Sequence, residues 1–212
     1  IDILPIPAFD DNYIWLLTRP GYTGCAVVDP GDDGPVIECL RAEGLALDAI
    51  LVTPDHGDHV GGMRGLSSVW PDAVVDGPAG EPIRTLERRL HGGDRVELPG
   101  LQAAFEVLDV PGHTEGHIAY HGHGALFCGD TLFAAGCGRV FSGTFDQLSD
   151  SLLRIGQLPA ETRAYCAHEY TLANLGFAAW VEPDNADLEA RTQRDRARRE
   201  RGEPTVPSTI GE

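Results

Sequence analysis

Histidine and aspartate side chains lie close together in one short stretch of the chain. His56, Asp58 and His59 fall within four positions, directly after the apolar run Ala49 to Val52 and before Gly61-Gly62. An apolar run followed by glycines predicts a buried strand that ends in a loop. Neutral imidazole nitrogen and carboxylate oxygen are ligands that zinc and iron accept. The spacing therefore indicates a loop that could help to hold two neighbouring divalent metals.

Three further segments carry residues of the same chemistry. His113 lies in the segment 111–117, Asp130 follows the apolar run 125–128, and His168 opens the sequence His-Glu-Tyr-Thr. A single histidine is more often a plain surface or core residue than a ligand. Four histidines and two aspartates, each at the end of an expected strand or in a glycine-flanked loop, instead favour one shared site.

The elements that must position these residues can be read from the hydrophobic pattern. We expect strands over 13–18, 25–28, 49–53, 94–98, 103–110, 118–121, 125–128 and 163–166. We expect helices over 35–43, 82–90, 147–155 and 184–201, with helical pattern from 172 and an extended arm over 203–209. The glycines around His123 predict a hairpin. Strands and helices in this order indicate an α/β protein with helices packed outside its sheets.

Composition excludes several classes of protein. The net charge is −17 and every basic residue is arginine, so a nucleic-acid backbone would be repelled. No apolar stretch approaches the roughly 18 residues that a membrane-spanning helix needs. Five scattered cysteines form no C-x-x-C pair, which favours reduced thiols and a cytoplasmic location. We expect a monomer that binds neither nucleic acid nor membrane.

Several motifs together resemble a known family. They are T-x-x-H-x-D-H at 53–59, P-G-H-T-x-G-H at 111–117, G-D at 129–130 and H-E-Y-T at 168–171, with F-D-D-N-Y at 9–13 and T-L-F-A-A-G-C-G-R at 131–139. The chain resembles the metallo-β-lactamase superfamily and, within it, the glyoxalase II family of hydroxyacylglutathione hydrolases. The resemblance implies an αββα sandwich with a C-terminal helical extension. We expect a metal-binding domain over 1–171 and a substrate-side helical segment over 172–212.

The resemblance also implies the roles of individual residues. His56 and His113 would hold one metal, Asp58, His59 and His168 the second, and Asp130 would bridge them. Asp58 would in addition be catalytic and orient the attacking hydroxide, while Arg139, Phe141 and Tyr170 would contact the glutathione part of the substrate. Zinc is the expected metal, with iron and manganese as alternatives.

Pro54 departs from the family pattern, because that position gives a histidine to the first metal in the family. Asp55 is adjacent, but neighbouring residues of an extended segment point in opposite directions. We therefore expect a weakened or altered first metal site. The family also continues beyond the arm 204–209 into a helical end with basic residues for the glutathione carboxylates, so we expect a shorter C-terminal segment here and weaker glutathione binding.

The resemblance implies one leading function, and two alternatives stay open. The leading one is hydrolysis of S-D-lactoylglutathione to D-lactate and glutathione by a hydroxide generated at the metals. The second is a re-purposed hydrolase of the same fold, such as a lactonase or a β-lactamase. The third is a catalytically weakened or non-enzymatic relative, which Pro54 motivates.

Overall fold

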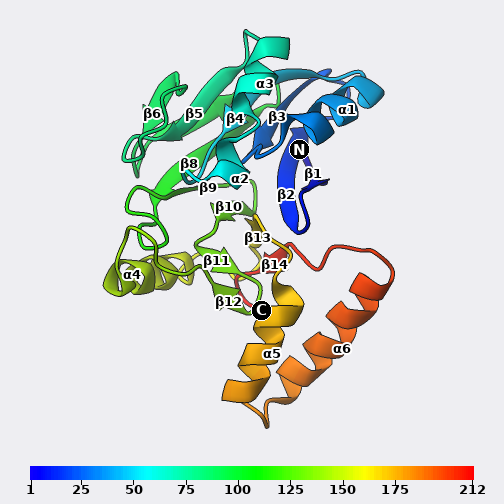
Figure 1. Ribbon diagram of the computed structural model, residues 1–212, viewed down its shortest axis with the longest axis vertical. Coiled ribbons are helices and arrows are strands. Elements are labelled where there is room, and N and C mark those ends of the chain that lie inside the picture. Colours follow the sequence, from blue (N-terminus) through cyan, green and yellow to red (C-terminus); the bar gives the residue numbers. More distant parts are fainter.

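Two six-stranded sheets pack face to face, and helices cover them from outside (Figure 1). The computed structural model describes residues 1–212. In the first sheet the strand order is β1-β2-β3-β4-β5-β6, in which β1 to β3 are antiparallel neighbours and β3 to β6 are parallel. These strands are β1 (Asp2–Ala8), β2 (Asn12–Thr18), β3 (Gly24–Val28), β4 (Ala46–Leu51), β5 (Val74–Pro78) and β6 (Arg88–Leu90).

The second sheet follows the order β14-β13-β10-β9-β8-β7. Only its β10–β13 pair is parallel. Its strands are β7 (Arg95–Leu98), β8 (Ala103–Asp109), β9 (Ile118–Gly122), β10 (Ala125–Gly129), β13 (Arg163–Cys166) and β14 (Ser208–Thr209). A small separate hairpin pairs β11 (Leu132–Phe133) with β12 (Gly136–Cys137). The expected hairpin of β9 and β10 around His123 is confirmed.

Six helices complete the fold, and their ends follow capping chemistry. They are α1 (Asp33–Glu43), α2 (Gly57–Val60), α3 (Met63–Val69), α4 (Phe145–Ile155), α5 (Thr171–Val181) and α6 (Ala186–Glu200). Asp32 caps α1 by accepting from Gly34 N, and Thr144 forms a capping box with Gln147 at the start of α4. Asn185 caps α6, and α5 and α6 project together from the sandwich (Figure 1).

The core explains why the strands read as nearly continuous apolar runs. Along β2, Tyr13, Trp15 and Leu17 face the second sheet in one buried cluster of 29 residues. The alternate residues Ile14 and Leu16 belong to a second cluster of 16 residues that includes side chains of α1 and α3. Because successive side chains of a strand point to opposite faces, a strand covered on both sides is apolar throughout.

The helix expected over 82–90 is wrong. Residues 88–90 form strand β6, which pairs parallel with β5 at the edge of the first sheet. Arg88 donates two hydrogen bonds of 2.6 and 2.5 Å to the carboxylate of Asp76, which is completely buried. This long-range ion pair and the strand pairing override the local helical pattern. No helix of the protein is both long enough and apolar enough to cross a membrane.

Candidate metal centre

The six side chains that the sequence singled out as metal ligands form two adjacent groups. His56, His113 and Asp130 make the first group, and their ligand atoms all lie within 4.8 Å of one another. Asp58, His59 and His168 make the second group under the same limit. Each of the six residues lies in a segment that follows one of the strands β4, β8, β10 and β13. Four separate strand ends thus deliver the ligands to one place.

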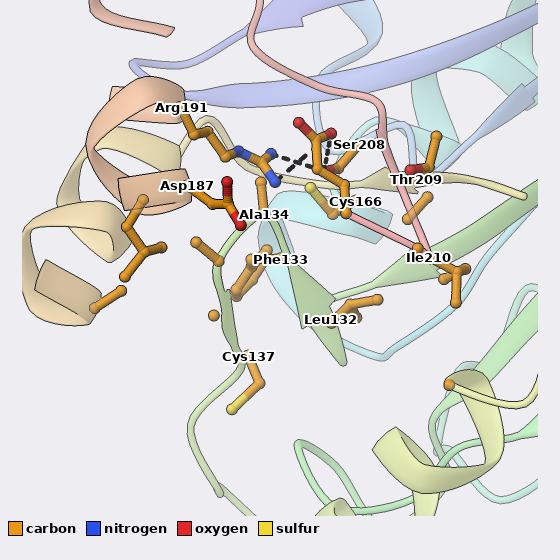
Figure 2. Close-up of a pocket in the computed structure, with 18 of the residues that line it drawn as sticks. Leu132, Phe133, Ala134, Cys137, Cys166, Asp187, Arg191, Ser208, Thr209 and Ile210 are labelled. Carbon is orange, nitrogen blue, oxygen red and sulfur yellow. Dashed lines mark hydrogen bonds and ion pairs between the residues drawn. The ribbon is translucent and has the colours of Figure 1, made fainter. Parts of the chain in front are cut away.

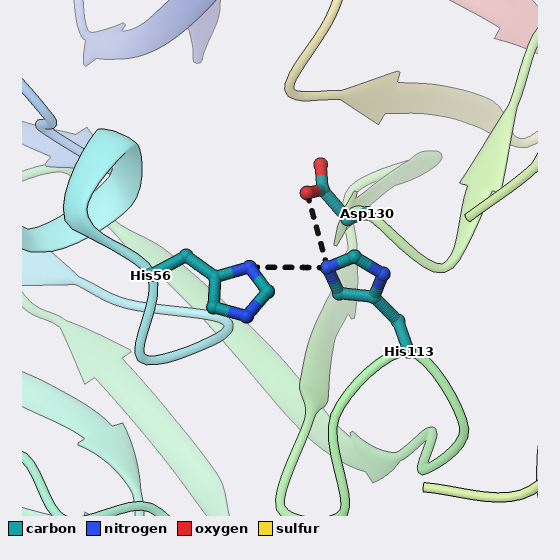
Figure 3. A group of neighbouring side chains, drawn as sticks. All are labelled: His56, His113 and Asp130. Carbon is teal, nitrogen blue, oxygen red and sulfur yellow. Dashed lines mark hydrogen bonds and ion pairs between the residues drawn. The ribbon is translucent and has the colours of Figure 1, made fainter. Parts of the chain in front are cut away.

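The first group is compact and oriented by a backbone contact. His113 Nε2 lies 3.1 Å from His56 Nδ1 and 3.3 Å from Asp130 Oδ2 (Figure 3). On the other side of its ring, His113 Nδ1 donates to the carbonyl oxygen of Arg139 at 2.8 Å. A histidine that donates through one nitrogen presents the other nitrogen's lone pair to a metal. His113 therefore has the orientation that a ligand needs.

Asp130 connects the two groups. Its Oδ2 lies 3.3 Å from His59 Nε2, and its Oδ1 lies 3.4 Å from His168 Nε2. Asp58 Oδ2 is 3.3 Å from the same His168 nitrogen and 3.7 Å from His59 Nε2. A carboxylate that reaches both groups is suited to hold two metals at a fixed spacing.

Unpartnered buried atoms test whether the residues fit a metal. His59 Nε2 and Asp130 Oδ1 are buried and have no hydrogen-bond partner within the protein. Buried polar groups are normally satisfied, so such atoms at the centre of a histidine and carboxylate cluster call for a ligand. Imidazole nitrogens and carboxylate oxygens are the donor set of divalent transition metals. The site therefore fits two divalent metals.

The charges of the cluster are strongly coupled. Burial lowers the pKa of His168, but the carboxylates of Asp130, Asp58 and Asp11 outweigh it and raise the value to about 10. Burial raises the pKa of Asp130, but the histidine nitrogens that surround its carboxylate hold that pKa well below its ordinary value. Without a metal, the carboxylates therefore hold protons on His59 and His168. A metal that binds here must displace those protons.

The loop that carries Asp130 depends on a glycine and on a buried histidine. Gly129 has a φ of 48°, where an added Cβ would lie 2.1 Å from Thr53 Oγ1, so this position requires glycine. His117 donates from Nδ1 to the Ile118 carbonyl at 2.9 Å and accepts at Nε2 from Asp130 N at 3.2 Å. The structure shows that His117 holds the backbone of Asp130.

Three polar residues lie directly behind the second group. Asp29 Oδ2 lies 3.1 Å from His59 Nδ1, and Asp29 accepts two hydrogen bonds from Thr53, at 2.8 and 2.6 Å. Asp29, which follows strand β3, therefore lies against the imidazole of His59. Asp11 contacts His168, and Asn12 contacts Asp58. The sequence alone does not assign a role to either residue. The sequence feature that points to Asp11 and Asn12 is their position in the F-D-D-N-Y motif.

Asp55 lies outside both groups. Pro54 is buried at the exit from β4, and Asp55 follows it with a half-buried side chain. The first group therefore consists of His56, His113 and Asp130, and no further carboxylate stands in for the family's histidine.

The three residues expected to contact substrate border the two groups. Phe141 has an exposed fraction of 52% and its ring lies 4.9 Å from that of His56. The guanidinium of Arg139 lies 3.9 Å above the Phe141 ring centroid, a cation–π contact. Tyr170 is partly exposed and stacks on His168 at 4.6 Å with an interplanar angle of 4°. A molecule that approaches the metal groups would meet these side chains.

A large cavity lies elsewhere in the protein. It measures about 1100 Å³ and is bordered by the β11–β12 hairpin, α5, α6 and the C-terminal residues (Figure 2). None of the six candidate ligands lines it. Arg191 crosses one side and donates to Ser208 Oγ at 2.7 Å. We place the chemistry at the histidine and aspartate groups, because reactive side chains converge there and not in this cavity.

The chain belongs to the metallo-β-lactamase superfamily. A family model described as the metallo-beta-lactamase superfamily matches residues 8–168. Among solved structures, ETHE1 from Myxococcus xanthus is similar with a TM-score of 0.70 and 28% identity, over 80% of this chain and 76% of that one. A structure described as TTHA1623 in a di-iron-bound form has a TM-score of 0.63 and 27% identity, over 79% and 92% of the two chains.

The C-terminal residues identify a family within this superfamily. A model described as the hydroxyacylglutathione hydrolase C-terminus matches residues 169–212. Hydroxyacylglutathione hydrolase of Vibrio campbellii is 52% identical over 212 residues, covering 99% of this chain and 82% of the relative. The same enzyme of Pseudomonas fluorescens is 52% identical over 211 residues with the same coverage. The chain therefore belongs to the hydroxyacylglutathione hydrolase (glyoxalase II) family of metal-dependent hydrolases.

Proposed function

We propose that the protein hydrolyses S-D-lactoylglutathione to D-lactate and glutathione. The observation that carries the proposal is the convergence of two histidine and carboxylate groups on Asp130, bordered by Arg139, Phe141 and Tyr170. Hydroxyacylglutathione hydrolase is the name of the relatives that match 99% of the chain. Because a thioester has a good leaving group, the thiolate can depart without a strong acid catalyst.

Metal chemistry would supply the nucleophile. Two divalent ions, when bound, provide a nucleophile at neutral pH and stabilise charge on the substrate carbonyl oxygen. We propose that His56 and His113 hold one ion, that Asp58, His59 and His168 hold the other, and that Asp130 contacts both. Zinc is the proposed metal, with iron and manganese as alternatives that the same donor atoms accept.

Asp58 is the proposed catalytic residue. Its Oδ2 accepts from Asn12 Nδ2 at 3.0 Å and lies near His168 Nε2, so the carboxylate is held in one orientation. The hydrogen bond from His168 holds the pKa of Asp58 far below its ordinary value, although burial opposes this. The carboxylate therefore stays ionised at neutral pH. It is suited to accept a hydrogen bond from the attacking water and fix its direction.

The exposed residues around the metal groups are the proposed substrate-binding residues. We propose that the positive charge of Arg139 attracts a glutathione carboxylate, while Phe141 and Tyr170 pack against the peptide part. We further propose two functional segments: residues 1–171 hold the metals and 172–212 lie on the substrate side. The proposed form is a cytoplasmic monomer, in line with the scattered cysteines.

A substrate panel tests this function. Protein with a measured metal content is offered S-D-lactoylglutathione, a lactone and a β-lactam, with Asp58→Asn as the catalytic variant. We expect thiol release from the thioester, and a loss of about 10²–10⁴-fold in Asp58→Asn, the range for a positioned proton acceptor. Turnover of the lactone or the β-lactam without thioester hydrolysis would establish a re-purposed hydrolase instead.

A further inference from the structure

The turn between β1 and β2 touches the second metal group at two points. Asp11 Oδ1 accepts a hydrogen bond of 2.9 Å from Nδ1 of His168. Asn12, the next residue, donates from Nδ2 to Asp58 Oδ2 at 3.0 Å. Both contacts cross from the first strand pair to residues far away in the sequence. Two of the three ligands in the second group are therefore held by one short N-terminal turn.

The Asp11 contact fixes which nitrogen of His168 faces the site. Nδ1 carries the proton that is donated to Asp11, so Nε2 is the nitrogen whose lone pair faces the site once the ring is neutral and binds a metal. Nε2 is the atom that lies 3.3 Å from Asp58 Oδ2 and 3.4 Å from Asp130 Oδ1. Tyr170 stacks on the face of the same ring. With one edge and one face held, the ring of His168 has little freedom to turn.

The backbone around Asp11 is fixed in place independently of the Asp11 side chain. Phe9 has a φ of 50°, a left-handed conformation that is uncommon for a bulky residue and marks a turn kept under strain. The carbonyl oxygen of Asp11 accepts from Glu169 N at 2.8 Å, and Tyr13 N donates to the Ala167 carbonyl at 2.7 Å. These bonds join the turn to the segment that carries His168 and do not involve the Asp11 side chain.

The first group has less support. His113 donates to one backbone carbonyl, that of Arg139. The only side-chain hydrogen bond of His56 is its contact with His113 Nε2. The second group, in contrast, has a polar side chain behind each of its members: Asn12 on Asp58, Asp29 beside His59 and Asp11 on His168. Partners behind a ligand raise its basicity and reduce the freedom that it loses on binding.

We propose that Asp11 is a positioning residue, whose carboxylate holds His168 with Nε2 toward the site and makes the second group the tighter of the two metal sites. This inference rests on the proposed metal binding. The side chain of Asp11 is 42% exposed, and the backbone hydrogen bonds of the turn do not depend on that side chain. The variant Asp11→Ala should therefore fold. Asp10→Ala is the matched control, since Asp10 is exposed and makes no side-chain hydrogen bond.

The experiment measures zinc binding to metal-free protein by competition with a chromophoric chelator. We expect the tighter zinc ion to bind about 10–100-fold more weakly in Asp11→Ala than in wild type, the usual effect of removing such a partner. Asp10→Ala should bind like wild type. In zinc-loaded protein, the Nδ1–H signal of His168 in a ¹H–¹⁵N correlation spectrum should move in Asp11→Ala and stay in place in Asp10→Ala.

Each outcome decides a separate question. Equal zinc affinity in Asp11→Ala and Asp10→Ala overturns the role of Asp11 and leaves the metal site standing. Weaker affinity without a change in the His168 signal also overturns it, because Asp11 would then not act through this histidine. Failure of wild type itself to bind zinc, iron or manganese would instead refute the proposed metal site.

Discussion

Tyr13 Oη donates a hydrogen bond of 2.8 Å to Glu169 Oε2, across 156 positions of sequence. The same carboxylate oxygen accepts from Thr205 N at 2.9 Å, and the other oxygen accepts from the Thr205 hydroxyl. Burial and the neighbouring carboxylate raise the pKa of Tyr13, so its hydroxyl remains a donor at all ordinary pH values. Glu169, the residue that follows His168, thus links β2 to the C-terminal arm.

Replacement of Glu169 by glutamine should loosen this junction. The variant Glu169→Gln turns one acceptor oxygen into an NH₂ group that faces donors from Tyr13 or Thr205. An unsatisfied buried group of this kind costs about 1–3 kcal/mol. Urea unfolding should show that loss, whereas Glu161→Gln, on an exposed residue without a side-chain hydrogen bond, should unfold like wild type. Equal midpoints for the two variants would contradict the role of Glu169.

Gly31 permits the close approach of the loop that carries Asp58. A Cβ added at Gly31 would lie 1.8 Å from the carbonyl oxygen of Asp58, which cannot move aside as a side chain end could. We expect Gly31→Ala to destabilise the protein by at least about 1–3 kcal/mol, as overpacking does, and to weaken metal binding. Gly176→Ala is the control, because nothing lies within 4 Å of that position in α5.

The control should behave in the opposite way. Glycine inside a helix is less favourable than alanine by about 0.5–1 kcal/mol, so Gly176→Ala should raise the thermal unfolding midpoint. A Gly31→Ala protein as stable as wild type would show that the loop near Asp58 can shift, and the account of this contact would be wrong.

The convergence of the six candidate ligands could be predicted from sequence because they lie in short motifs. His56, His113, Asp130 and His168 each follow an apolar run, and the ends of such strands meet at one edge of the sandwich. Asp11 could not be given its role in this way. The proposed role depends on a contact with His168, 157 positions away, that no local pattern describes.

The errors in the expected elements have the same origin. Residues 82–90 have a helical pattern, but the segment 88–90 becomes a strand through its pairing with β5 and the bond from Arg88 to Asp76. Strand β5 and helix α3 were not predicted at all. His117 shares a motif with His113, yet it accepts its hydrogen bond from Asp130 N, since only the folded chain brings the two loops together.

His117 should make the protein sensitive to acid. Complete burial lowers the pKa of His117 to about 3, while the unfolded chain binds the proton near pH 6.5. Because the folded-state value is depressed, the stability that His117 contributes is present above pH 6.5 and is lost as the pH falls toward 3. The unfolding free energy should fall by up to about 1.4 kcal/mol per pH unit in this window from this group alone.

The variant His117→Gln isolates this contribution. Glutamine keeps an acceptor for Asp130 N but does not titrate. Metal-free protein is unfolded with urea at several pH values between 7 and 3.5, and the wild type should lose stability more steeply than the variant below pH 6.5. Parallel curves would mean that His117 is not held neutral in the folded protein.

We propose that two metal groups joined by Asp130 carry out thioester hydrolysis although Pro54 stands where a further histidine ligand of the first group is expected. The most direct test is the hydrolysis rate of S-D-lactoylglutathione against the number of zinc ions bound per chain, for wild type and for Pro54→His. We predict that turnover of wild type rises with the second, more weakly bound ion, and that Pro54→His reaches the same state at lower free zinc. Both ions bound without turnover in either protein would contradict the account.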